Sequence, residues 1–106
     1  MVLGLAGNGA QLTDGTEQTI INQSSVNHYG TYIFTNNMQV GDELTIRVEV
    51  LDNTGITLRK YLDIALTGVQ LSPAVFIPFI PTGQYKVTIQ RTAGVDRTYN
   101  WEYWTT

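Results

Sequence analysis

The sequence predicts an all-β fold: a single antiparallel β-sandwich of about seven to eight strands, jelly-roll-like in its arrangement. Apolar and polar residues alternate along most of the chain after residue 14, which is typical of strands that bury one side and expose the other. Turn-forming residues separate these stretches at intervals of roughly ten residues, as in sandwiches and jelly rolls. No segment has helical periodicity, which argues against βαβ units.

The 106 residues suffice for one domain with one core, which we assign to residues 13–106. Residues 1–12 contain three glycines and two alanines with few polar anchors, so we expect a flexible N-terminal arm. Two interpretations of the arm stay open. It is a disordered terminus, or it becomes ordered on a neighbouring subunit, which Val2, Leu3 and Leu5 would contact.

About seven strands are expected, each bounded by turn residues. They are Thr16–Asn22, Tyr29–Thr35, 43–52, 55–66, Ala74–Ile80, Gln84–Thr92 and Thr98–Thr105. The first follows the turn pair Asp14-Gly15, and in the second Tyr32 and Phe34 alternate with Ile33. Asparagine and glycine residues between positions 36 and 42 then indicate a connection.

The clearest element is a β-hairpin over residues 43–66. Leu44, Ile46 and Val48 fall on one face of its first strand, and polar residues fall on the other. The sequence Asp-Asn-Thr-Gly at 52–55 supplies the turn, after which the apolar alternation resumes.

The later strands follow the same logic. Pro78 interrupts the strand over residues 74–80, and because proline has no N–H to donate, we expect this strand at a sheet edge or bent there. The turn at 81–83 leads into a strand in which Tyr85 and Val87 alternate with polar residues. A turn at 93–96 precedes the last strand.

Composition excludes several classes of partner. The net charge of −3 argues against nucleic-acid binding, which needs clustered lysine and arginine. No apolar run approaches the roughly 18 residues of a membrane span. Cysteine is absent, which excludes disulfides and thiolate metal sites. The first ten residues lack the basic region of a signal peptide, so we expect synthesis in the cytoplasm without signal cleavage.

No residue pattern points to catalysis. His28, the one histidine, lies in an expected polar loop without a serine and aspartate at a recognisable spacing. Most of the nine carboxylates adjoin turns, where aspartate bonds its own backbone. Calcium binding at the turn over 52–55 is conceivable, but one carboxylate falls short of the oxygen ligands such a site needs. We therefore expect no catalytic residue, no cofactor and no metal site.

The aromatic C-terminal strand is the strongest candidate for contact with a partner. Alternation places Tyr99, Trp101 and Tyr103 on one face and Glu102 and Trp104 on the other. One face can bury against the opposing sheet, which leaves Trp104 directed to solvent or to a partner. Exposed tryptophan and tyrosine side chains stack on sugars or anchor protein interfaces. That all four rings only close the core stays an alternative.

Three stretches together resemble a class of small tailed-phage virion proteins found among head and structural genes. They are LTDGTEQT at Leu12–Thr19, VGDELTIRVEV at Val40–Val50 and KVTIQRTAGVDRTYNW at Lys86–Trp101. In the family the last stretch is a hairpin. This chain departs from the pattern in having Arg91 inserted and in continuing past Trp101 to Trp104. The resemblance implies a β-sandwich virion component without catalytic residues.

The expected function is therefore that of a non-enzymatic virion protein, a capsid decoration or cement protein that binds the outer surface of a phage head and stabilises the lattice. Its expected partners are major capsid protein subunits and further copies of itself, with a trimer favoured. The expected contact residues are Val2, Leu3, Leu5, Tyr103 and Trp104. The alternative is a carbohydrate- or receptor-binding module of a fibre or spike, with Trp101, Tyr103 and Trp104 as its stacking platform. A hydrolase is disfavoured, because no base and nucleophile can be paired.

Overall fold

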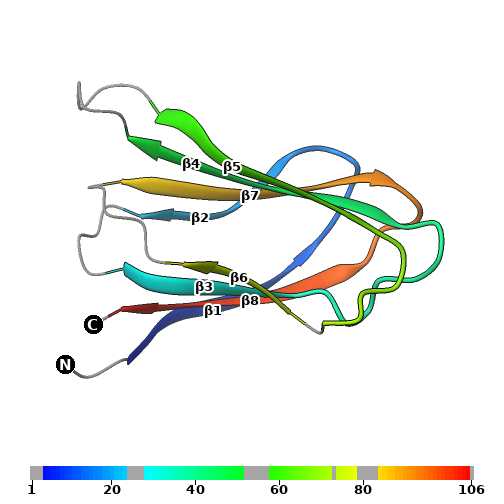
Figure 1. Ribbon diagram of the computed structural model, residues 1–106, viewed down its shortest axis with the longest axis horizontal. Coiled ribbons are helices and arrows are strands. Elements are labelled where there is room, and N and C mark those ends of the chain that lie inside the picture. Colours follow the sequence, from blue (N-terminus) through cyan, green and yellow to red (C-terminus); the bar gives the residue numbers. More distant parts are fainter. Residues whose placement is uncertain (1–3, 24–27, 52–57, 73, 79–83, 106) are drawn as a thin grey trace.

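The computed structural model describes residues 4–23, 28–51, 58–72, 74–78 and 84–105 of the chain. These residues form eight β-strands and no helix, arranged as two four-stranded antiparallel sheets packed face to face (Figure 1). The prediction of an all-β, antiparallel sandwich is therefore confirmed.

The strands of the two sheets interleave along the chain. In order they are β1 Gly4–Leu12, β2 Gln18–Gln23, β3 His28–Phe34, β4 Glu43–Leu51, β5 Leu58–Thr67, β6 Ala74–Pro78, β7 Tyr85–Ala93 and β8 Thr98–Thr105. One sheet has the order β1-β8-β3-β6 and the other the order β2-β7-β4-β5. The chain changes sheet at every connection except that between β4 and β5, which gives the strand order of a jelly roll.

The hairpin predicted over residues 43–66 is confirmed as β4 and β5, with Ile46 opposite Ile64. The edge position expected from Pro78 is also confirmed, because β6 pairs only with β3 among the described strands. The stretch Lys86–Trp101 is not the hairpin that the resemblance implied, since β7 and β8 belong to different sheets. Each of these two strands has an apolar face, and both apolar faces are buried because the strands lie on opposite sides of the core.

The expected arm over residues 1–12 differs from the structure. Its described part, Gly4–Leu12, is strand β1, which pairs antiparallel with β8 at the edge of a sheet. Gly7 lies opposite Tyr103 and Gly9 opposite Trp101. A Cβ atom at Gly9 would lie 2.7 Å from Cζ2 of Trp101, so the aromatic ring covers the bare glycine backbone. Gly7 and Gly9, which suggest flexibility in the sequence, therefore leave room for the aromatic rings of β8 to pack against the backbone of β1.

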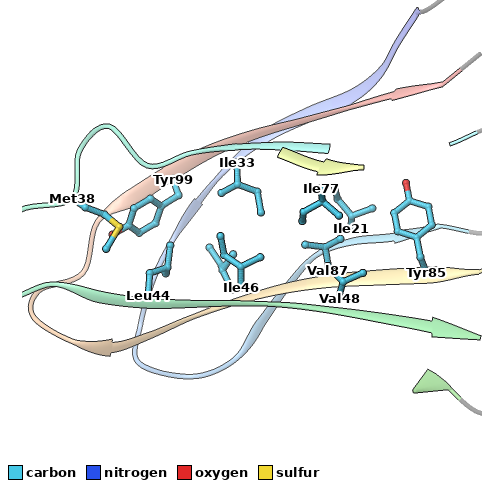
Figure 2. Close-up of a cluster of buried hydrophobic side chains, with 11 residues drawn as sticks. Ile21, Ile33, Met38, Leu44, Ile46, Val48, Ile77, Tyr85, Val87 and Tyr99 are labelled. Carbon is cyan, nitrogen blue, oxygen red and sulfur yellow. The ribbon is translucent and has the colours of Figure 1, made fainter. Parts of the chain in front are cut away.

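The core fills the space between the sheets along their length. Figure 2 shows Met38 and Tyr99 at one end of this cluster and Tyr85 at the other. Between them lie isoleucine and valine side chains from the inner faces of both sheets: Ile21, Ile33, Ile46, Val48, Ile77 and Val87, with Leu44 towards the Met38 end. Ile89 belongs to the same cluster. Burial raises the pKa of the Tyr85 hydroxyl well above its usual range, with a smaller contribution from Tyr103.

A buried carboxylate, that of Asp42, holds the loops together at one end of the sandwich. It accepts a hydrogen bond from Nε of Arg97 at 2.5 Å and bonds from the backbone N–H groups of Gln39, at 2.8 Å, and Val95, at 3.4 Å. The backbone C=O of Asp42 accepts a further bond from the N–H of Gly68. The connections β3–β4, β5–β6 and β7–β8 are therefore joined through one residue.

Candidate functional site

The outer face of the β1-β8-β3-β6 sheet gathers aromatic side chains from three strands. Along β3, Thr31 and Ile33 are buried, whereas Tyr32 and Phe34 alternate with them and point away from the core. The strand register places Tyr32 between Glu102 of β8 and Phe76 of β6. We use the name aromatic face for six of the outward residues of this sheet: Leu5, Tyr32, Phe34, Phe76, Glu102 and Trp104.

Tyr32 contacts the rings of Phe34 and Phe76, and the aromatic face remains accessible. The ring centroids of Tyr32 and Phe76 are 4.8 Å apart, and those of Tyr32 and Phe34 are 6.4 Å apart. Phe76 is 41% exposed and Leu5 is 45% exposed, while the remaining aromatic side chains are half-buried. The ring of Phe76 lies over Gly30, where a Cβ atom would clash with it. The absence of a side chain at Gly30 therefore lets the ring lie flat across the strand.

One carboxylate, that of Glu102, belongs to this otherwise apolar face. Glu102 neighbours Tyr32 in the sheet, and its Oε1 accepts a hydrogen bond from the indole Nε1–H of Trp104 at 3.2 Å. It is the one charged side chain of the aromatic face, and no cation in the described part of the chain forms an ion pair with it. A cationic or hydrogen-bond-donating group of a partner could therefore bind here.

The outer face of the other sheet is different in character. There Arg47 lies between two carboxylates, with Nη1 3.1 Å from Glu17 Oε2 and Nε 3.3 Å from Asp63 Oδ1. These two charges raise the pKa of the Arg47 guanidinium above its usual value. Thr88 also donates a hydrogen bond to Glu17. The charges of Arg47, Glu17 and Asp63 are therefore paired with one another, whereas Glu102 lies beside the rings of the aromatic face without an ion-pair partner among the described residues.

Two of the residues expected to contact a partner meet on the aromatic face. Leu5 lies opposite Trp104 in the pairing of β1 with β8, although they are 99 positions apart in the sequence. Tyr103 lies on the inner face, where its ring stacks on Trp101 at 6.2 Å and packs against the core. Val2 and Leu3 lie outside the described residues.

Tyr32, Phe34 and Phe76 are not among the residues that the sequence predicts to contact a partner. The alternation of Tyr32 and Phe34 with Ile33 was visible, and it marks one of the two faces as outward. Which face points outward depends on the opposing sheet, and the pairing of β3 with β6 and β8 is a tertiary property. The stacking platform proposed for Trp101, Tyr103 and Trp104 is wrong in composition, because the first two rings face inward.

The structure describes the other candidate positions only in part. His28 is the first residue of strand β3 and does not lie in a loop, and the structure does not describe its side chain. The turn at 52–55 also lies outside the described residues. Among the residues that the structure describes, no group of three or more metal-ligating side chains comes together. The aspartates Asp42 and Asp96 bind Arg97 and Arg91, respectively, in loop contacts.

The chain matches no protein-family model, no curated protein sequence and no solved structure. Within the described ranges, no helix has the length and apolar character to cross a membrane.

Proposed function

We propose that this protein is a non-enzymatic structural component of a virus particle, a capsid decoration or cement protein that binds the outer surface of a phage head through its aromatic face. Its partners are major capsid protein subunits, and it acts by burying surface against several of them, which raises the free energy needed to separate them. It would be assembled onto the virion in the host cytoplasm.

The observation that carries this proposal is the asymmetry between the two outer faces. One presents Phe76, Tyr32 and Trp104 as accessible rings, while the described part of the other carries the ion pairs of Arg47 with Glu17 and Asp63. Aromatic residues are enriched where protein interfaces bind most strongly, and charged residues are depleted there. Jelly rolls occur in viral capsid proteins, which is an analogy at the level of fold.

The proposal is tested with heads assembled from the major capsid protein encoded in the same genome. The heads are mixed with purified protein, sedimented, and the bound protein is quantified. We expect saturable binding by the unaltered protein and a loss of at least about tenfold in affinity for Phe76→Ser or Trp104→Ala, the size of loss found for central interface residues. Lys86→Ala, on the outer face of the other sheet, should bind as the unaltered protein does. Absence of binding to heads contradicts the proposal.

A second candidate function is carbohydrate or receptor binding at a fibre or spike. It is favoured by the position of Glu102 and Asn100 beside the exposed rings on one sheet face. Aromatic rings stack on sugar rings, and carboxylate and amide groups bind sugar hydroxyls. Glycan-array screening distinguishes the two functions: retention of a defined glycan that Trp104→Ala abolishes favours this one, and an empty array leaves the capsid proposal in place.

A further inference from the structure

Strand β1 is a long sheet edge that lacks charged residues and proline, and its register irregularity is confined to one end, between Leu5 and Gly7. An edge strand directs unpaired backbone N–H and C=O groups away from its sheet, and these form a template for a further strand. β1 has nine residues, Gly4–Leu12, of which none is charged and none is proline. In the described structure its one neighbour is β8.

The three other edges carry the features that natural proteins use to block such pairing. β5 includes Arg59 and Asp63. β6 has only five residues and ends at Pro78. β2 has six residues and a register irregularity between Thr19 and Ile21. Of the four edge strands, β1 is therefore the best suited to pair with a further strand.

The geometry of β1 suits close approach by a second strand. Its register irregularity lies near one end, between Leu5 and Gly7, and the pairing with β8 is regular from Gly7 onward. The exposed side chains of Asn8 and Ala10 are short and uncharged. The inner side of the strand is filled by the rings of Trp101 and Tyr103, which hold the glycine backbone in place.

We propose that β1 pairs antiparallel with β1 of a second copy of this chain, joining two four-stranded sheets into one. A second copy is the occupant because a strand that pairs with itself about a two-fold axis satisfies both exposed edges in one step. The absence of charge in β1 means that this pairing brings no like charges together.

This assembly differs from the trimer that the resemblance implies, since an antiparallel pair closes with two chains. It also has a consequence for binding. A two-fold axis perpendicular to the joined sheet keeps both aromatic faces on the same side, so the dimer would present two copies of the surface to a lattice. The pairing itself is independent of the proposed function, and it is measured on the isolated protein.

The first test is the mass in solution by sedimentation velocity over a series of concentrations. The unaltered chain should shift with concentration to twice the mass of one chain. Asn8→Lys places two ammonium groups near each other across the axis and should leave a monomer. Asn22→Lys, the same change at an exposed position of edge strand β2, should still dimerise. Circular dichroism verifies that both variants are folded.

The second test uses the absence of native cysteine. Asn8→Cys and Ala10→Cys are each oxidised and run on a non-reducing gel, and a covalent dimer is expected for at least one of them, because antiparallel pairing brings mid-strand positions within disulfide range. Asn22→Cys should remain monomeric. The proposal is overturned by a monomer at every soluble concentration, by a trimer, by a dimer insensitive to Asn8→Lys, or by equal cross-linking at position 22.

Discussion

Neutralising Asp42 should strongly destabilise the sandwich. The substitution Asp42→Asn keeps the size of the side chain and removes its charge. The carboxylate is 4% exposed and accepts three hydrogen bonds, from Arg97, Gln39 and Val95. The carboxylate thereby joins the β3–β4 connection to the β7–β8 connection.

The magnitude follows from the three hydrogen bonds. A hydrogen bond to a charged acceptor contributes about 1.5–3 kcal/mol, and a bond to a neutral acceptor contributes about 0.5–1.5 kcal/mol. Replacing the carboxylate of Asp42 by an amide should therefore weaken each of its hydrogen bonds by about 1 kcal/mol. The bond from Val95 is long at 3.4 Å and contributes less. We therefore expect a loss of about 2–3 kcal/mol out of a total stability of roughly 5–15 kcal/mol. At about 4–8 °C per kcal/mol for a domain of this size, Tm should fall by roughly 10–20 °C.

The loss should also depend on pH. The hydrogen bond from Arg97, followed by those from Gln39 and Val95, holds the pKa of Asp42 below its usual value against the opposing effect of desolvation. A carboxylate with a lowered pKa in the folded state stabilises the protein above its unfolded pKa of about 3.9, and this stabilisation is lost as the pH falls through the folded value. The difference between the two proteins should therefore be full at neutral pH and shrink below about pH 4.

The assay is urea denaturation followed by tryptophan fluorescence between neutral and acidic pH. Asp14→Asn is the matched control, because Asp14 is an exposed turn residue at the same end whose carboxylate accepts its hydrogen bonds from the backbone N–H and the hydroxyl of nearby Thr16. It should destabilise less than Asp42→Asn. The reasoning is refuted if the two substitutions have equal effects at neutral pH, or if the effect of Asp42→Asn is the same at pH values above and below 4.

Three further results are expected. Gly9→Val should destabilise the protein by about 1–3 kcal/mol, because the valine side chain overlaps the Trp101 ring. Gly4→Ala should have little effect, because no atom lies within 4 Å of the added Cβ. Denaturation measures both, and equal effects would contradict the packing of β1 against β8. Stability should fall above about pH 10, because the unfolded Tyr85 hydroxyl ionises while the folded one keeps its proton, and Tyr85→Phe should reduce this fall in alkaline denaturation curves. Arg47→Met should lower Tm less than Asp42→Asn does, and that decrease should shrink at about 1 M salt, where exposed ion pairs are screened; a salt-independent decrease would contradict an electrostatic origin.

The strands after residue 14 could be predicted from the sequence, because alternation and turn chemistry act over a few residues. Leu44, Ile46 and Val48 share a face through strand geometry alone, and the chain needed no information from elsewhere to indicate a hairpin. Alternation along the last strand likewise predicts that Trp104 points away from the face that carries Trp101 and Tyr103. The structure agrees, because Trp101 and Tyr103 pack inward against the core.

The pairing of the strands and the choice of buried face depend on contacts between distant segments of the chain, which local patterns do not contain. The glycines of β1 indicate flexibility when considered alone, and they form a strand because the rings of β8, about ninety residues later, cover them. The aromatic face likewise arises where β3, β6 and β8 meet, so no contiguous stretch contains it. Side-chain alternation is a property of neighbouring residues, whereas burial is a property of the opposing sheet, and that sheet is assembled from distant segments of the chain.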